Sequence, residues 1–403
     1  MVNPDYNILK DWMFGKLNAL LENLDPNPDY PILKMSLGEP TLSMPDFVKD
    51  ELSLNYNEWG KYPPSTAIPK LSNSILKYIE RRYPGAEKII NINKNIVPVP
   101  GTREPLHLVG LLAKNTKIGE TTSIVTNPFY HAWRAGSISS GSKIYWLNAL
   151  PENKYLPNIS NIPENILNSS VIMYICTPSN PHGGIASLNY LKNAILLARK
   201  YNFILAIDEC YSDIYRLNKP KPAGGLDAAF SLGNNLDNVV IFNSLSKRSN
   251  ASGIRAGFIA GDEKIIDSYK LLVSNGASPV PIPIQKVAAT LYDDEEHNTK
   301  ACIHYDHNFQ IVEKYLKPFY KDFKIPEAGF FLWLKVDNDK NAAKILWSKY
   351  SLRVMPGSYM ATDVDGYNPG KNYLRIAVVD NQEVIEEAMK RISLYLQSKL
   401  QNN

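Results

Sequence analysis

The sequence predicts an α/β protein in which a mostly parallel, mixed sheet is sandwiched between helices, with a smaller α+β unit attached. Between residues 95 and 261, short apolar runs alternate with segments that carry apolar residues at helical spacing. This alternation is typical of strand–helix–strand units. The strand candidates are apolar throughout rather than at every second position, as in strands that are covered on both faces. After about residue 290 the pattern changes to a long helix, two strands and a final helix.

Each expected strand is a short run rich in Val, Ile and aromatic residues, bounded by polar residues, glycine or proline. These runs are 95–101, 122–128, 143–148, 170–178, 203–209, 239–246 and 256–261. Helices are expected at 103–115 and 188–202, because apolar residues recur there every three or four positions. The same spacing predicts a helix over residues 8–24 near the start of the chain.

The second part of the chain should form a unit of its own. A chain of 403 residues is longer than one hydrophobic core usually serves. The expected elements are a helix at 295–320, strands at 328–336 and 372–379, and a helix at 381–400. We therefore expect a large domain over residues 45–290 and a small domain made of residues 1–44 and 291–403.

Composition and charge exclude several classes of protein. Hydrophobic content of 44%, charged content of 21% and a formal net charge of +4 are ordinary for a globular protein. The densest basic stretch, residues 80–88, also contains glutamates, and we interpret it as the solvated end of a helix. No basic stripe suited to nucleic acid is present. The N-terminus lacks the pattern of a signal peptide, and no apolar run is long enough to span a membrane. A cytoplasmic protein without nucleic-acid or membrane partners is the expectation.

The three cysteines argue against a disulfide framework or a metal site. They are Cys176, Cys210 and Cys302, an odd number at wide spacing, which fits a reducing compartment. Cys176 and Cys210 stand in apolar, strand-like surroundings, where cysteine usually acts as a small buried hydrophobe. No metal site is expected.

Residues 242–258 carry the strongest chemical signal. The buried strand that precedes them ends on Ser244 and Ser246, followed by Lys247 and, eight positions later, Arg255. Two hydroxyls and a planar guanidinium suit a phosphate, and a lysine at a strand end can bond an aldehyde cofactor as a Schiff base. A lone loop lysine more often reaches solvent, but these neighbours favour the cofactor site.

Other strand ends supply matching groups. Asp208, with Tyr211 three residues later, could bind a metal, cap a helix or pair with a protonated ring nitrogen. The Asn180 amide could hold a ring oxygen, although Asn-Pro is often only a turn. Gly101 and Thr102 lead from a strand into a helix whose N-terminal amides could cradle a phosphate or simply be capped.

The order of these motifs resembles the fold-type-I, pyridoxal-phosphate-dependent aminotransferases of class I and II. The resemblance implies pyridoxal 5′-phosphate as cofactor, with Lys247, Asp208 and Tyr211 as catalytic residues. Lys247 would hold the cofactor and move the proton at the substrate α-carbon, and Asp208 would keep the ring nitrogen protonated. The implied cofactor-binding residues are Gly101, Thr102, Arg103, Tyr130, Asn180, Asp208, Tyr211, Ser244, Ser246, Lys247 and Arg255, with Tyr62 contributed by the partner subunit of a homodimer.

The resemblance also implies how the substrate carboxylate is held. Arg375 stands in an otherwise apolar strand, where an unpaired guanidinium is costly. A structural ion pair would satisfy it, whereas in the family an arginine in this context binds the α-carboxylate. Gly38 and Asn180 would complete the substrate-binding set. Arg103 is a candidate for a second, distal acid group, although it could only pair with Glu104.

A narrower resemblance, over residues 101–106, 244–262, 274–285, 355–360 and 366–379, is to N-succinyl-diaminopimelate aminotransferases of lysine biosynthesis. It implies an amino diacid as donor and 2-oxoglutarate as acceptor. Aspartate or broad-specificity aminotransferases share nearly every cofactor residue and are the nearest alternative. A pyridoxal-dependent β-lyase and a non-enzymatic cofactor sensor are the remaining ones.

Overall fold

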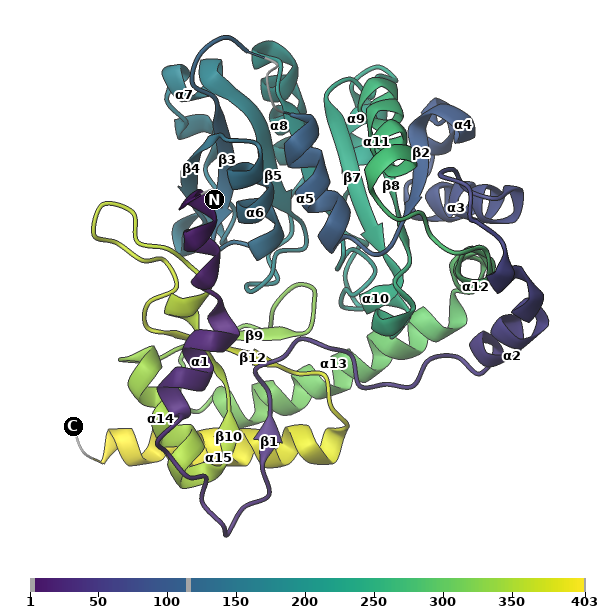
Figure 1. Ribbon diagram of the computed structural model, residues 1–403. Coiled ribbons are helices and arrows are strands. Elements are labelled where there is room, and N and C mark those ends of the chain that lie inside the picture. Colours follow the sequence, from purple (N-terminus) through teal and green to yellow (C-terminus); the bar gives the residue numbers. More distant parts are fainter. Residues whose placement is uncertain (1–3, 114–116, 402–403) are drawn as a thin grey trace.

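A seven-stranded sheet forms the centre of the computed structural model, which describes residues 4–113 and 117–401 (Figure 1). Its strands follow the order β2-β8-β7-β6-β5-β3-β4. The strands β3 to β7 pair in parallel, and β8 is antiparallel to both β7 and β2. Their bounds are β2 (Ile96–Val99), β3 (Thr122–Asn127), β4 (Lys143–Asn148), β5 (Ser170–Cys176), β6 (Ile204–Asp208), β7 (Val239–Ser244) and β8 (Gly257–Gly261). The predicted mixed, mostly parallel sheet is confirmed.

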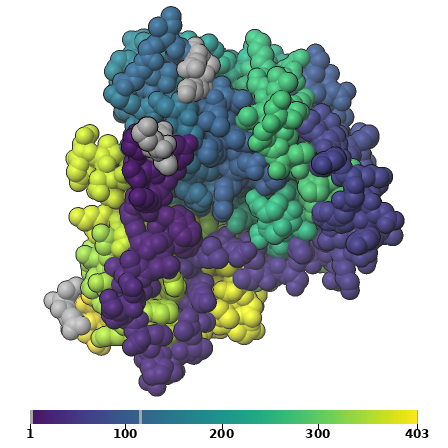
Figure 2. Space-filling model, in the orientation of Figure 1, coloured from purple at the N-terminus to yellow at the C-terminus, as the bar shows by residue number. Residues whose placement is uncertain are grey.

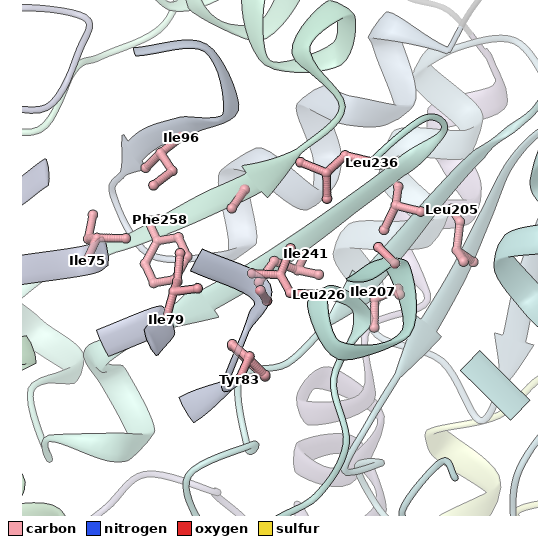
Figure 3. Close-up of a cluster of buried hydrophobic side chains, with 14 of the residues drawn as sticks. Ile75, Ile79, Tyr83, Ile96, Leu205, Ile207, Leu226, Leu236, Ile241 and Phe258 are labelled. Carbon is pink, nitrogen blue, oxygen red and sulfur yellow. The ribbon is translucent and has the colours of Figure 1, made fainter. Parts of the chain in front are cut away.

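The continuous apolar runs have their expected cause, because both faces of this sheet are covered. Every residue of β3, β5, β7 and β8 is buried. One face packs against α3 (Pro69–Arg82), α8 (Leu188–Tyr201), α9 (Gly225–Ser231) and α12 (Ile282–Asp293). Figure 3 shows part of this core, where Ile75 and Ile79 of α3 lie near Phe258 and Ile241. The other face packs against α5 (Arg103–Leu112), α6 (His131–Ser139) and α11 (Glu263–Gly276).

The smaller sheet is built as the C-terminal pattern predicts. Its order is β11 (Met355–Pro356), β12 (Tyr373–Ala377) and β9 (Phe331–Lys335), all antiparallel. A separate hydrophobic cluster joins it to α13 (Glu296–Leu316), α14 (Asp339–Tyr350) and α15 (Gln382–Leu400). A two-residue strand from the start of the chain, β1 (Leu33–Lys34), pairs in parallel with β10 (Leu352–Arg353). The division into two domains with the expected boundaries stays a proposal.

The remaining elements are short. They are the α-helices α1 (Met13–Leu21), α2 (Phe47–Leu54), α4 (Ile92–Asn95), α7 (Glu164–Ser169) and α10 (Leu245–Arg248), and the 3₁₀ helices η1 (Pro4–Lys10), η2 (Tyr56–Gly60), η3 (Ala86–Ile89), η4 (Pro151–Asn153), η5 (Ile159–Asn161), η6 (Ser252–Ile254) and η7 (Gly357–Tyr359). The helix expected at 103–115 ends at Leu112, and Lys114 and Asn115 lie outside the described residues. Within residues 4–113 and 117–401, no helix combines the length and apolarity that a bilayer span requires.

The N-terminal helix differs from the prediction of one helix over residues 8–24. A 3₁₀ helix ends at Lys10, Trp12 is extended (φ −104°, ψ 127°), and α1 begins at Met13. The carbonyl of Asp11 accepts a hydrogen bond from Arg134 of α6 (2.7 Å), so a tertiary contact overrides local helix propensity. This segment runs along the surface from the C-terminal part towards α6 (Figure 2).

The basic stretch at 80–88 contains the end of α3, as expected, and Glu80, Arg81 and Lys88 are exposed, but Arg82 is not solvated. Arg82, the last residue of α3, is only 4% exposed. Its Nε lies 3.3 Å from a carboxylate oxygen of Asp213, and its guanidinium donates to the carbonyls of Ser212 (3.2 Å) and Pro222 (2.8 Å). A buried charge of this kind requires such partners, and they come from residues more than a hundred positions away.

Candidate active site

A cavity of about 440 Å³ lies at the carboxyl ends of the central strands, the usual ligand position in open α/β sheets. Most of the predicted site residues line it, although they come from segments far apart in the sequence. They are Gly38, Thr102, Arg103, Tyr130, Asn180, Asp208, Tyr211, Ser244, Ser246, Lys247, Arg255 and Arg375. Gly101 lies behind this lining, against Arg255. Tyr62 lies apart, fully exposed on the surface.

Lys247 enters the cavity from α10, the single helical turn that follows β7. Ser244 caps this turn, since its hydroxyl accepts a hydrogen bond from the backbone N–H of Ser246 (3.2 Å). The Lys247 amine donates to the carbonyl of Gly38 (2.5 Å). Burial lowers the pKa of Lys247 to about 8, because desolvation disfavours the charged amine. The fraction of nucleophilic, unprotonated amine near neutral pH is therefore much larger than for an ordinary lysine.

Asp208 ends β6 with a side chain that is 5% exposed. Burial raises its pKa to about 6, opposed by hydrogen bonds from Cys210, whose backbone N–H donates to Oδ1 (3.1 Å). Cys210 is not the simple core residue that we expected. It lines the cavity, and its sulfur lies 2.8 Å from the Thr102 hydroxyl.

Arg255 forms one wall of a polar cradle with Ser244, Ser246 and Thr102. Its guanidinium donates to the Ser246 hydroxyl (3.4 Å) and to the carbonyls of Ser252 and Pro100 (2.9 Å each). All three acceptors are neutral, so the positive charge is left for an anion. Gly101 has φ +72°, and a Cβ there would collide with this guanidinium. Only glycine leaves the cradle open.

Asn180, Tyr211 and Arg375 form a connected group. The Asn180 amide donates to the Tyr211 hydroxyl (3.3 Å), and its oxygen accepts from Arg375 (3.2 Å). Arg375 also donates to the carbonyl of Ser36 (2.8 Å) and lies over the Phe331 ring, 4.4 Å from its centroid. The amide therefore orients the guanidinium in the cavity wall.

The alternative of a structural ion pair for Arg375 is not supported. Among the described residues it forms no salt bridge, and its Nε is buried without a hydrogen-bond partner. Burial lowers its pKa to about 10. Other buried arginines, such as Arg82 and Arg216, do have carboxylate partners. A buried cation without an anion, in the wall of a cavity, is suited to bind a carboxylate.

Tyr130 and Gly38 both line the cavity, as expected of site residues. The Tyr130 hydroxyl accepts a hydrogen bond from Arg103 Nε (3.1 Å), and burial raises its pKa. Its ring lies beside His131, with 4.3 Å between centroids. At Gly38 a Cβ would collide with the ring of Phe331, so the backbone can approach this side of the cavity only as glycine.

Several lining residues were missed from the sequence. They are Asp11, Trp12, Met13 and Phe14 from the N-terminal segment, Arg134 of α6, and Phe331, Tyr359 and Met360 from the C-terminal part. Arg134 stands four positions after Tyr130, and this helical spacing was the one available signal. His131 also lines the cavity, whereas His182 stacks on Tyr155, with 4.5 Å between ring centroids, away from it.

The residues of the cavity fit a phosphorylated pyridine aldehyde. The glycine-floored cradle around Arg255 suits its phosphate, and the Lys247 amine suits its aldehyde. The buried carboxylate of Asp208 suits a ring N–H. No group of three or more His, Cys, Asp or Glu residues is placed to hold a metal ion in the part of the chain that the structure describes.

Comparison with known proteins agrees with this chemistry. The family model for aminotransferase class I and II matches residues 30–392. An LL-diaminopimelate aminotransferase of Dehalococcoides mccartyi is 26% identical over 376 residues, which cover 91% of this chain and 92% of that protein. A similar relative comes from Natranaerobius thermophilus (25% identity, 96% and 98% covered). The crystal structure of an aminotransferase from Neisseria meningitidis matches with a TM-score of 0.92 and 32% identity, covering 98% of this chain and all of that one. The aminotransferase AspB of Helicobacter pylori gives 0.87 and 28%, with 98% and 99% covered.

Proposed function

The chain belongs to the class I and II aminotransferases, which depend on pyridoxal 5′-phosphate, and from this premise we propose that it acts on an amino diacid of the diaminopimelate type. The acceptor in this proposal is 2-oxoglutarate, and the reaction belongs to the biosynthesis of diaminopimelate and lysine. The observation that carries the transfer of an amino group from an amino acid is the Lys247 amine and the unpaired Arg375 guanidinium in the walls of one cavity, and the choice of a diacid is supported by the motifs and by the relatives. Lys247 is placed to act where the amino group of the substrate reacts, and Arg375 is placed to bind the carboxylate of the same substrate.

The cofactor supplies an aldehyde that captures amines and a ring that withdraws electrons from the substrate α-carbon. In the proposed site its phosphate is held by Arg255, Ser244, Ser246, Thr102 and the amides that follow Gly101. Arg103 and Tyr130 border the ring, and the hydroxyl of Tyr211 and the amide of Asn180 bind its oxygen. Tyr62 would reach the phosphate from a partner subunit.

Asp208 keeps a proton on the ring nitrogen in this proposal. Its burial raises the cost of an isolated negative charge, and a cationic N–H partner removes that cost. Lys247 moves the proton of the substrate α-carbon, a task for which a pKa lowered to about 8 is well suited. The Gly38 carbonyl, which accepts a hydrogen bond from this amine, holds it on the cavity side.

Arg375, Asn180 and Gly38 bind the α-carboxylate in the same proposal. Arg375 is already oriented by the Asn180 oxygen and the Ser36 carbonyl, and its Nε is free to donate. A planar guanidinium matches a carboxylate with two parallel hydrogen bonds. The family assignment favours transamination over the β-lyase and cofactor-sensor alternatives.

The form of the donor rests on two kinds of support. The motifs at 101–106, 244–262, 274–285, 355–360 and 366–379 favour N-succinyl-L,L-diaminopimelate. The curated relatives are named for LL-diaminopimelate without the succinyl group, and that free diacid is the second candidate. Aspartate is the nearest rival, because most of the matching motifs concern the cofactor.

A half-reaction screen tests the donor. The cofactor-loaded protein is mixed with N-succinyl-L,L-diaminopimelate, LL-diaminopimelate, glutamate, aspartate or phenylalanine, and the loss of visible cofactor absorbance is followed. We expect rapid loss with glutamate and with one of the two diaminopimelates, which also identifies the form. If only aspartate or phenylalanine removes the absorbance, the donor proposal is wrong.

We also propose a homodimer with shared active sites. The segment around η2 exposes large apolar side chains, with Leu54 81%, Tyr56 74% and Tyr62 101% exposed. Such a cluster is unusual on the surface of a monomer. A cytoplasmic location stays a prediction that rests on the three free cysteines.

A further inference from the structure

Arg134 is a buried cation that the cofactor and the α-carboxylate do not require. It lies on α6, lines the cavity and is 3% exposed. Its guanidinium packs over the ring of Phe129, 4.7 Å from the centroid. Its Nε is buried without a hydrogen-bond partner. Part of its donor capacity is thus unused inside a cavity that accepts charged substrates.

The groups that do contact Arg134 belong to Asp11. Nη2 donates to the Asp11 carbonyl (2.7 Å), and Nη1 lies 3.5 Å from its carboxylate. Asp11 stands where the N-terminal helix is interrupted, is 42% exposed, and also pairs with Lys16. A carboxylate from a surface segment therefore lies against a buried arginine of the cavity.

The other arginines of the cavity are engaged differently. Arg255 belongs to the phosphate cradle, and Arg375 is oriented by Asn180. Arg103, the candidate from the sequence, is exposed and donates to Tyr130. Arg134 combines burial, a free donor and a carboxylate that an incoming ligand can replace, which is what a second acid group requires.

We propose that Arg134 binds the distal carboxylate of diacid substrates and that Asp11 occupies this position as an internal carboxylate until a substrate replaces it. The identity of the substrate as a diacid rests on the proposed function. The exchange is balanced in charge, since one carboxylate leaves the arginine as another arrives, and Asp11 keeps Lys16 and solvent as partners. A monoacid has no second carboxylate to bind Arg134, so Asp11 stays in place. The exchange therefore selects diacids.

Calorimetry on the cofactor-loaded protein with two unreactive acids of equal chain length tests this subsite. Glutarate carries two carboxylates and pentanoate carries one, and neither has an amine to react. We expect the native protein to bind glutarate more tightly. Arg134→Gln should reduce the preference for glutarate over pentanoate by about tenfold or more. Arg199→Gln, on α8 and outside the cavity, should leave the preference unchanged.

A second variant tests the subsite without the removal of a buried arginine, which could destabilise the protein. Asp11→Asn removes the competing charge from a partly exposed position, so glutarate should bind several-fold more tightly while pentanoate changes little. Asp29→Asn, an exposed residue of the same N-terminal region, is the matched control and should change neither affinity.

Three outcomes would overturn the subsite. The first is an equal loss of affinity for glutarate and for pentanoate in Arg134→Gln. The second is no selective gain for glutarate in Asp11→Asn. The third is a selective loss in Arg103→Gln with none in Arg134→Gln, which would assign the distal group to Arg103. Because neither acid reacts, these results are independent of the donor screen: a wrong donor leaves the glutarate preference intact, and a wrong subsite leaves the donor screen unaffected.

Discussion

Lys247 and Arg375 show how burial changes the chemistry of single residues. Both are basic side chains withdrawn from water, and the pKa of each is lowered by desolvation. Neither forms a salt bridge to any described residue, in contrast to Arg248 and Arg82 nearby. An unpaired buried cation costs stability, so these two positions are better explained by the ligands proposed for them than by the fold.

The lowered pKa of Lys247 leads to a pH prediction. Only the unprotonated amine reacts with an aldehyde, so cofactor-free protein should capture pyridoxal 5′-phosphate faster as the pH rises, with a midpoint near 8. An ordinary lysine would give a midpoint above about 10. Stopped-flow absorbance between pH 6 and 10 measures this. Lys247→Ala should show no covalent capture and no turnover, and a covalent adduct in that variant would show that another amine is the reactive one.

The stability of the cofactor-free protein should also depend on pH through Lys247, because the pKa of this residue is lower in the folded protein than in the unfolded chain. Between about pH 8 and pH 10.5 the unfolded chain holds a proton on Lys247 that the folded, cofactor-free protein has lost. The contribution of this residue to the free energy of unfolding therefore rises with pH in that window.

Removal of Arg375 should chiefly weaken substrate capture. Arg375→Ala should lower kcat/KM for glutamate by the equivalent of about 2–5 kcal/mol, because the carboxylate loses a desolvated, charged partner. Arg375→Lys keeps the positive charge but lacks the planar guanidinium, so its kcat/KM should lie between those of the native protein and Arg375→Ala. Cofactor affinity, measured by titration, should stay near the native value. A variant that loses cofactor and substrate affinity equally would contradict a role confined to the carboxylate.

Helices α5 and α6 each position residues of the cavity wall, and the two helices pack closely against each other at a pair of glycines. Helix α5 begins at Arg103, directly after Thr102, and α6 begins at His131, directly after Tyr130, and carries Arg134. Gly110 and Gly136 face each other where the helices touch, and a Cβ on Gly110 would lie 2.8 Å from backbone atoms of Gly136. The absence of two side chains sets the spacing of the helices and thereby the width of the site.

Gly110→Ala should therefore destabilise the protein despite the better helix propensity of alanine. We expect the free energy of unfolding to fall by about 1–3 kcal/mol, the usual effect of overpacking. Gly15→Ala in α1 is the control, since only Trp12 lies near, at 3.9 Å; it should be neutral or stabilising by up to about 1 kcal/mol. Denaturant unfolding measures both. A neutral Gly110→Ala would show that the helices can separate without cost.

On the scale of the whole molecule, the cavity joins parts of the chain that are distant in sequence. The N-terminal segment, the ends of the central strands and the smaller sheet each contribute to its walls, and Figure 1 shows the N-terminal segment running from beside the central sheet to the C-terminal helices. Tyr62 is the one proposed site residue that this single chain leaves fully in solvent. The assembly is therefore part of the proposal for the site.

If Tyr62 reaches the phosphate of a partner subunit, its loss should weaken cofactor binding although it is far from the cavity of its own chain. Tyr62→Ala should raise the Kd for pyridoxal 5′-phosphate roughly tenfold, the equivalent of one hydrogen bond to a charged group. Tyr367→Ala, a half-exposed tyrosine outside the cavity lining, should have no effect. Sedimentation should show a dimer for all three proteins. A monomeric native protein, or an unchanged Kd for Tyr62→Ala, would contradict shared active sites.

Local patterns were sufficient for the central sheet and for the residues at its strand ends. Apolar runs predicted β3, β4 and β7 within two residues at each end, because a strand buried on both faces excludes polar residues along its whole length. Asp208 and Lys247 were found because polar residues at the ends of such strands stand out. The break at Trp12, the burial of Arg82 and the cavity position of Cys210 were not predicted.

The sequence by itself determined the fold class, the family and the chemical groups at the ends of the central strands, since each depends on short local motifs and on their order along the chain. Only the tertiary structure decided which of these charges have partners. The contact between Asp11 and Arg134 joins residues 123 positions apart, and the missing partner of Arg375 becomes visible only when every neighbour is in place. The cost of a buried charge depends on all the atoms around it, and no local pattern records them.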